Sequence, residues 1–185
     1  PFNIRLWQLG NETSYGNLTF TREQSIDHTI EFAREMRRRD PAIQLIGWGD
    51  RGRGIRELWA AELLKRAGEH IDMVAIHMMG QSPKRQDTVL RGMRYQKAPE
   101  QAWDELLELS SNVEARVKEL EDVIAASGVR KGVAITEGHL SLVPHNANPI
   151  LAEWLSAAYH ARSLNIYQRH GANVKIATAA DFQGN

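Results

Sequence analysis

Two glutamates occupy equivalent places in the sequence, each the first carboxylate after a short apolar segment. Glu12 follows the segment 4–9, and Glu137 follows the segment 132–136. A carboxylate at the end of a buried strand is costly to desolvate, and α/β enzymes keep their chemistry at such positions. Two facing carboxyl groups can hydrolyse a glycosidic bond, because one protonates the leaving oxygen while the other attacks the anomeric carbon or activates water.

The geometry of such a pair decides the reaction, and each glutamate also has a simpler interpretation. A carboxyl separation of about 5 Å would give retention of configuration, and about 6.5–9.5 Å would give inversion. Either residue alone fits a salt-bridged or solvent-facing strand end at least as well as a catalytic group. The two together, with Asn11 directly before Glu12, favour catalysis.

Three further side chains near expected strand ends could contact a substrate. Trp48 offers a large flat apolar surface on which a sugar could stack, although a Trp packed on the rim of the fold fits equally well. His77 ends an apolar segment and is predicted to face the site, with a core-capping role as the alternative. His139 lies shortly beyond Glu137. The spacing of His77, His139 and His145 matches no recognised ligand pattern, so we expect neither a metal nor a cofactor.

Apolar segments and helix-forming segments alternate along the chain and would position these groups. Strands are expected over 4–9, 42–46, 71–77, 132–136 and 174–177, and helices over about 21–40, 55–67, 99–127 and 150–169. Thr19 or Thr21 is the expected N-cap of the first helix, and Asn148-Pro149 begins the last helix. Strands that alternate with helices predict a parallel sheet with right-handed crossovers.

Two architectures contain such a sheet, a doubly wound open sheet and a barrel. The first would place a glycine-rich phosphate loop after the first strand, where this chain has the single Gly10 followed by Glu12. The barrel instead places polar groups at the ends of several strands, as this sequence does. We therefore predict an α/β fold of the (β/α)8 TIM-barrel type, of which residues 1–185 hold strands four to eight without an internal domain boundary. The remainder of the barrel is expected upstream, because the chain begins at Pro1 without a methionine.

Composition excludes several classes of partner. Lys plus Arg and Asp plus Glu are both 23, so the formal net charge is zero, and neither nucleic acid nor an anionic membrane surface is expected as a partner. The absence of cysteine excludes disulfides and thiol chemistry. No apolar run approaches the roughly 18 residues of a membrane span. The sequence leaves the oligomeric state open, including a homo-oligomer, and does not fix the compartment, although the cytoplasm is favoured over secretion.

A resemblance to a known family becomes visible at the first of the two glutamates. The segment Trp7-Gln8-Leu9-Gly10-Asn11-Glu12 resembles the Trp-x-x-Gly-Asn-Glu signature at the end of the fourth barrel strand in clan A glycoside hydrolases. Within the clan, nearly the whole chain is most similar to family 51, the α-L-arabinofuranosidases. This narrower resemblance rests on residues 10–12 with Tyr15-Gly16, and on the segments 33–46, 135–137 and 165–177.

The resemblance implies a role for each matching residue. Glu12 would be the general acid/base and Glu137 the nucleophile of a retaining, double-displacement reaction. Asn11 would bind the sugar 2-hydroxyl, and His77 matches a histidine of the family. The implied carbohydrate substrate is a terminal α-L-arabinofuranosyl residue of a plant polysaccharide or oligosaccharide, and no cofactor is implied.

The chain departs from the family pattern where the pocket is expected. Ile76 precedes His77 where the family usually has an acidic residue, and Gly138 follows Glu137 where it usually has Trp. These positions shape the pocket, so three alternatives stay open. They are another clan A activity such as a xylosidase or endoglucanase, a catalytically inactive sugar-binding barrel, and a metal-dependent hydrolase that uses the histidines.

Overall fold

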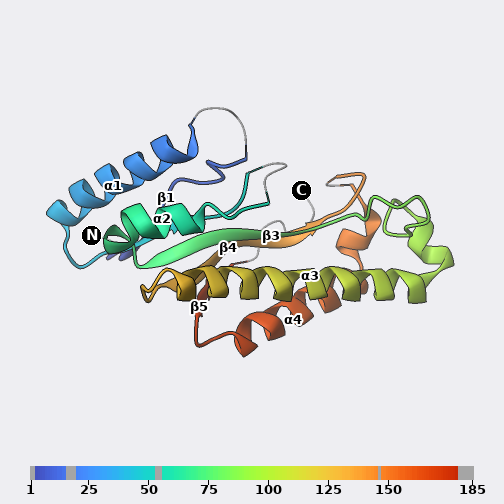
Figure 1. The fold of residues 1–185 in the computed structure, drawn as a ribbon. Coiled ribbons are helices and arrows are strands. Elements are labelled where there is room, and N and C mark those ends of the chain that lie inside the picture. Colours follow the sequence, from blue (N-terminus) through green and yellow to red (C-terminus); the bar gives the residue numbers. More distant parts are fainter. Residues whose placement is uncertain (1–2, 16–19, 53–55, 146, 179–185) are drawn as a thin grey trace. The chain divides into compact units, whose positions relative to one another are not determined.

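Strands and helices alternate along the chain, as the sequence predicts (Figure 1). The computed structural model describes residues 3–15, 20–52, 56–145 and 147–178. Its main elements are β1 (Leu6–Leu9), α1 (Arg22–Arg39), β2 (Gln44–Trp48), α2 (Ala60–Ala67), β3 (Met73–Gln81), α3 (Pro99–Ala126), β4 (Gly132–Ser141), α4 (Trp154–Arg169) and β5 (Val174–Ala177). Short 3₁₀ turns are η1 (Gly68–His70), η2 (Arg94–Lys97) and η3 (Pro149–Ala152).

The five strands form one sheet in which each strand neighbours the next one in sequence, in the order β1-β2-β3-β4-β5. β1 pairs in parallel with β2, with Leu9 opposite Gly47, and β2 pairs in parallel with β3, with Ile46 opposite Met73. A doubly wound sheet would reverse its strand order at a switch point, and this sheet has no reversal among the described strands. The sequential order is that of consecutive strands in a barrel.

The chain divides into two compact units, which are described separately. The first unit comprises 1–76 and 119–134, and the second comprises 77–118 and 135–185. The division passes through β3, α3 and β4 and falls on no linker. The expectation that the chain has no internal domain boundary therefore stays a prediction.

In the first unit, α1 forms because its N-terminal groups are capped and one of its faces is apolar. The Thr21 hydroxyl accepts from the backbone N–H of Gln24, and the Gln24 side chain accepts in return from the Thr21 N–H. Ile26 and Ala33 are each 1 % exposed on the buried face. Thr21 is therefore the N-cap, while the alternative, Thr19, lies outside the described residues.

Gly49, directly after β2, lets the chain approach α2 closely. Its N–H donates to the carbonyl of Ala75 at 3.0 Å, and its carbonyl accepts from the N–H of Ala60 at 2.9 Å. A Cβ atom at this position would lie 2.3 Å from Cγ1 of Val74 and 3.1 Å from Cβ of Ala60. The close packing therefore requires glycine.

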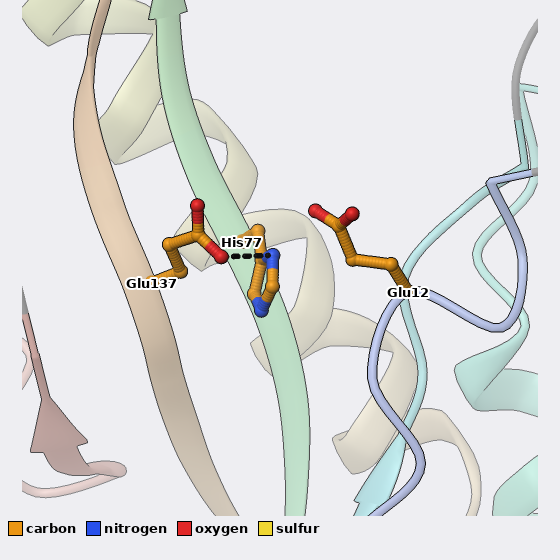
Figure 2. A group of neighbouring side chains, drawn as sticks. All are labelled: Glu12, His77 and Glu137. Atoms are coloured by element: carbon orange, nitrogen blue, oxygen red, sulfur yellow. Dashed lines mark ion pairs between the residues drawn. The ribbon is translucent and has the colours of Figure 1, made fainter. Parts of the chain in front are cut away.

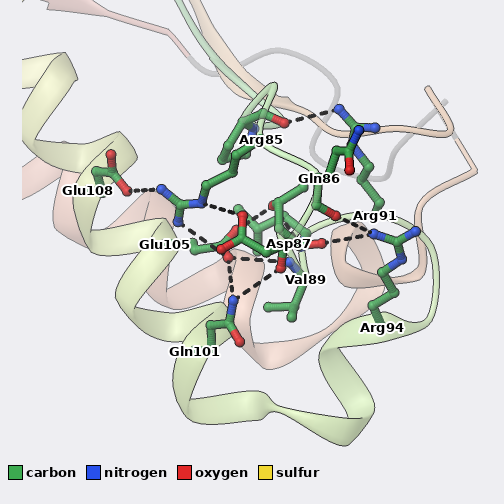
Figure 3. A network of polar contacts seen from close by, with 12 residues as sticks. Arg85, Gln86, Asp87, Val89, Arg91, Arg94, Gln101, Glu105 and Glu108 are labelled. Atoms are coloured by element: carbon green, nitrogen blue, oxygen red, sulfur yellow. Dashed lines mark hydrogen bonds and ion pairs between the residues drawn. The ribbon is translucent and has the colours of Figure 1, made fainter.

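In the second unit, a buried carboxylate ties the connection between β3 and α3 to the helix (Figure 3). Glu105 of α3 is 2 % exposed and accepts from the Thr88 hydroxyl and from the Val89 N–H at 3.3 Å. It also accepts from Gln101 Nε2 at 3.0 Å and contacts Arg85 Nη2 at 3.3 Å. Because a buried charge must be paired and hydrogen-bonded, this network fixes the loop onto α3.

Several boundaries differ from the sequence expectation. β3 and β4 extend to Gln81 and Ser141, beyond the expected ends at 77 and 136. α2 begins at Ala60, whose N–H donates to the Gly49 carbonyl, and not near 55. Residues 53–55 lie outside the described residues. The last helix is preceded by the turn η3 after the expected Asn148 cap. The helical patterns around Trp59, Trp103 and Trp154 predict core packing for all three, but Trp154 begins α4 and is 81 % exposed.

No helix among the described residues combines the length and the apolar character needed to cross a membrane.

Candidate active site

The second of the two glutamates lies on β4, where a fully buried apolar stretch becomes polar. Ile135, two residues before it, is 0 % exposed, whereas the side chain of Glu137 is 24 % exposed. The Nδ1 atom of His77 lies 3.3 Å from Oε2 of Glu137, an ion pair between neighbouring strands that Figure 2 draws as a dashed line. Glu137 therefore lies where β4 leaves the buried core, and its carboxylate contacts the imidazole of His77.

A second histidine contacts the other oxygen of the same carboxylate. The Nδ1 atom of His139 lies 3.4 Å from Oε1 of Glu137. Residues two apart on a strand point to the same face, which is why Glu137 and His139 meet. Distances of 3.3 and 3.4 Å are long for aligned hydrogen bonds, so we describe both as ion-pair contacts. The carboxylate therefore has one imidazole at each oxygen.

His77 occupies an interior position of β3, although the sequence placed it at a strand end. Its side chain is 1 % exposed, and its backbone carbonyl accepts from Nη1 of Arg116 on α3 at 2.7 Å. The extension of β3 beyond His77 explains the difference from the prediction. His77 is therefore fixed by the strand and by a helix of the same unit, and it contacts the predicted nucleophile.

The first unit holds Glu12 in an uncommon backbone conformation. Gly10 has φ +80° and Glu12 has φ +51°, so both adopt the left-handed region that few residues other than glycine enter. The carbonyl of Glu12 accepts from the N–H of Tyr15 at 2.9 Å, which closes the turn after β1. Backbone strain of this kind is frequent at functional positions. Asn11 is exposed, and its Oδ1 accepts from Gln8 Nε2 at 3.4 Å.

Trp48 lies in a buried polar cluster of the first unit. Its side chain is 2 % exposed, its Nε1 donates to the Ser14 hydroxyl at 2.8 Å, and its ring makes an edge-on contact with Tyr15. The Tyr15 hydroxyl donates to Oδ2 of the fully buried Asp50 at 2.8 Å. This burial matches the alternative of a packed Trp, and a sugar contact by Trp48 stays a prediction. The sequence did not indicate the Tyr15–Asp50 contact, because the two residues belong to different loops.

A small cavity of about 20 Å³ lies beside His139 in the second unit. Its lining includes residues of β4 and α4 and residues at the end of β5, among which are His139, Tyr159, His160, Tyr167 and Thr178. Burial, with a smaller contribution from the charge of His139, lowers the pKa of His160. Burial raises the pKa of Tyr159 to about 12. The cavity thus places neutral aromatic and imidazole groups behind the residue that contacts Glu137.

The metal-dependent alternative grouped His145 with His77 and His139. His145 is exposed after β4, and its Nδ1 lies 3.2 Å from the Ser141 hydroxyl. The other two histidines contact Glu137. The structure therefore joins His77 and His139 through a carboxylate and places His145 in a separate contact.

Comparison with known proteins shows which sequences and structures this chain is similar to. No known protein-family model matches this sequence. An intracellular exo-α-(1→5)-L-arabinofuranosidase of Streptomyces lividans is 36 % identical over 81 residues, which is 42 % of this chain and 12 % of that protein. The chain therefore spans only a small part of the length of this curated relative.

Several solved structures share the fold over nearly the whole chain. An α-L-arabinofuranosidase from Thermotoga maritima has a TM-score of 0.73 at 19 % identity. The matched region covers 97 % of this chain and 34 % of that protein's chain. A family 51 α-L-arabinofuranosidase from Bifidobacterium longum has a TM-score of 0.73 at 17 % identity, covering 96 % of this chain and 38 % of its own. A family 44 endoglucanase from Clostridium thermocellum has a TM-score of 0.71 at 12 % identity, covering 98 % and 44 %.

These similarities confirm the predicted architecture. The five parallel strands and their helices are part of a TIM barrel of the kind found in glycoside hydrolases, and the chain spans about a third of the Thermotoga maritima barrel protein. The predicted resemblance to clan A, and to family 51 within it, is confirmed as well.

Proposed function

We propose that this chain carries the two catalytic carboxyl groups of a retaining glycoside hydrolase that removes terminal α-L-arabinofuranosyl residues from plant polysaccharides or oligosaccharides. The observation that carries the proposal is the carboxylate of Glu137, held between two imidazoles on a strand of a barrel whose similar structures include arabinofuranosidases. Because the chain spans a minor part of those proteins, the rest of the barrel is expected to complete the pocket.

The proposed reaction proceeds by two displacements at the anomeric carbon. In the first, Glu137 attacks this carbon while Glu12 donates a proton to the leaving oxygen, and a covalent glycosyl ester forms on Glu137. In the second, Glu12 takes a proton from a water molecule that attacks the same carbon, and the ester bond to Glu137 breaks. The sugar is released with its original configuration, and both carboxyl groups return to their starting states.

The remaining residues take supporting roles in this proposal. Asn11, directly before Glu12, hydrogen-bonds the sugar 2-hydroxyl, a contact that strengthens in the transition state. His77 contacts Glu137 and borders the sugar. The left-handed backbone conformation at Glu12 supports its assignment, since strained backbone is frequent at functional positions.

The roles of the two glutamates predict different behaviour for their amide variants. Glu137→Gln cannot form the ester, so its rate on an aryl α-L-arabinofuranoside should fall by roughly 10³-fold or more. Glu12→Gln should lose about 10²–10⁴-fold on natural linkages but much less on aryl glycosides whose leaving group needs no proton. Glu35→Gln, which removes only an exposed ion pair with Arg38, is the matched control and should keep wild-type rates. Wild-type turnover by Glu137→Gln would contradict the assignment.

Endoglucanase activity is the second candidate, because a family 44 endoglucanase shares the fold at a TM-score of 0.71. It would use the same two glutamates with a pocket for a β-glucan chain. Parallel assays on an aryl arabinofuranoside, an aryl xyloside and a soluble cellulose derivative separate these activities. Calorimetric binding of an oligosaccharide without turnover on any of them would favour the inactive sugar-binding barrel.

A further inference from the structure

We propose that His139 is a positioning residue for the carboxylate of Glu137, and that a buried seat formed by His160 and Tyr159 on α4 fixes its ring. This inference rests on the proposed function, because it assigns a task to Glu137. It concerns His139, directly after Gly138, the position at which this chain departs from the usual Trp of the resembling family.

The first support is that each carboxylate oxygen of Glu137 contacts a different imidazole. Nδ1 of His139 lies 3.4 Å from Oε1, and Nδ1 of His77 lies 3.3 Å from Oε2. A carboxylate held at only one oxygen can still rotate about its terminal torsion, which is broad and roughly two-fold. Contacts at both oxygens restrict this rotation. Glu137 therefore keeps one defined orientation of its attacking oxygen when both rings are present.

The second support is the packing behind His139. Its side chain is 10 % exposed and borders the cavity that is also lined by Tyr159 and His160. The rings of Tyr159 and His160 pack edge to face, with centroids 5.5 Å apart and planes at 80°. This contact holds the Tyr159 and His160 rings against each other, and rigid supporting residues are what precise positioning of a reacting group requires. The cavity of about 20 Å³ leaves room for one water molecule but not for a second ring position.

The third support is electrostatic. Burial lowers the pKa of His160, with the charge of His139 as a second cause, so His160 is neutral at neutral pH. Burial keeps Tyr159 protonated, and burial also raises the pKa of Tyr167 in the same lining. These lining groups are therefore uncharged, and Glu137 is the acidic side chain that His139 contacts.

The charged and titratable groups around His139 come from four elements of the second unit. Glu137 contributes from β4 and His77 from β3. On α4 the groups are Tyr159, His160 and Tyr167, and on α3 Arg116 donates to the His77 carbonyl at 2.7 Å. Thr178, after β5, is uncharged and donates to the carbonyl of Thr136 at 2.6 Å.

The test compares three histidine variants in the full chain on an aryl α-L-arabinofuranoside. His139→Leu should lower kcat about tenfold or more with KM changed less than about twofold, because the contact acts on the reacting group and not on substrate binding. His139→Gln keeps a polar side chain that can still contact the carboxylate, and it should stay within about threefold of wild type. His145→Gln is the control from the same unit and should match wild type.

The result that would overturn the inference is a His139→Leu variant with wild-type kcat, while its melting temperature equals that of wild type. Equal impairment of the Gln and Leu variants would also overturn it, since that pattern reports lost packing and not a lost polar contact. If His139→Leu does not fold, His160→Phe decides the case, because a lowered kcat at an unchanged KM supports the inference and a wild-type kcat overturns it.

A second readout separates this inference from the proposed function. The Nδ1 resonance of His139, followed by nitrogen NMR, should change in Glu137→Gln and stay unchanged in Glu35→Gln, whether or not the protein turns over any arabinofuranoside. If the resonance changes but the protein has no turnover, the proposed function is contradicted and the contact between His139 and Glu137 is supported. If the Nδ1 resonance is the same in Glu137→Gln as in wild type, the positioning role is contradicted even in an active enzyme.

Discussion

Replacement of Glu105 tests whether the loop between β3 and α3 depends on its buried carboxylate. Glu105 is 2 % exposed and gathers the Thr88 hydroxyl, the Val89 N–H, the Gln101 amide and the Arg85 guanidinium (Figure 3). In Glu105→Ala all four donors lose this acceptor. Gln101 and Arg85 lie toward the surface and can turn to water, whereas Thr88 is fully buried.

The size of the stability loss follows from the two buried donors, the Thr88 hydroxyl and the Val89 N–H, which water cannot reach. An unsatisfied buried donor costs about 1–3 kcal/mol, and removal of one member of a buried charged network typically costs about 3–5 kcal/mol. Since Arg85 is 41 % exposed, we expect a loss of about 2–4 kcal/mol in the free energy of unfolding. The measurement is urea unfolding at neutral pH. Glu108→Gln, which removes a 60 % exposed partner of Arg85, should cost no more than about 1 kcal/mol.

The same carboxylate predicts a pH dependence. Burial alone would raise the pKa of Glu105, but hydrogen bonds from Thr88, Gln101, Val89 and Arg85 outweigh it and lower the pKa below the usual 4.5. Its stabilisation is therefore complete above about 4.5 and is lost as the pH falls through the lowered value. The gap between wild type and Glu105→Ala should shrink on acidification. A variant as stable as wild type at neutral pH, or a gap that does not shrink, would refute this reasoning.

Two further substitutions test the packing of the first unit by the same unfolding measurement. Gly49→Ala should lose about 1–3 kcal/mol, because its new methyl group would lie 2.3 Å from Cγ1 of Val74; a neutral effect would show that the approach to α2 is not tight. Thr21→Ala should lose about 1 kcal/mol through the broken capping box with Gln24, and unchanged stability would argue against this N-cap.

Local signals in the sequence were sufficient to predict the order of elements and most helix ends. The Thr21 cap, the Asn148 cap and the start of α3 at Pro99 follow from the residues themselves, because caps and prolines act on their immediate neighbours. The extensions of β3 and β4 were not predicted, since strand length depends on pairing with another strand. The exposure of Trp154 was missed for a similar reason, because residue type alone does not fix which side of a helix is covered.

The candidate site divides in the same way. The contact between Glu137 and His139 was in principle readable from their two-residue spacing once β4 was known to continue past 136. The approach of His160 from α4 was not, because no sequence spacing encodes a helix packed against a particular strand position. The burial of Trp48 likewise depends on Ser14, from another loop. The sequence therefore indicated candidate reacting groups, whose roles stay a prediction, and tertiary packing determined what surrounds them.

The most direct measurement of the central claim is identification of the residue that carries the sugar. The full chain, with Glu12→Gln to slow hydrolysis of the ester, is incubated with an aryl α-L-arabinofuranoside that has a good leaving group, quenched, digested and analysed by mass spectrometry. The account predicts a single pentosyl adduct on the peptide that contains Glu137, absent when Glu137→Gln is added. An adduct on another residue, or turnover with no covalent adduct and inverted product, would contradict it.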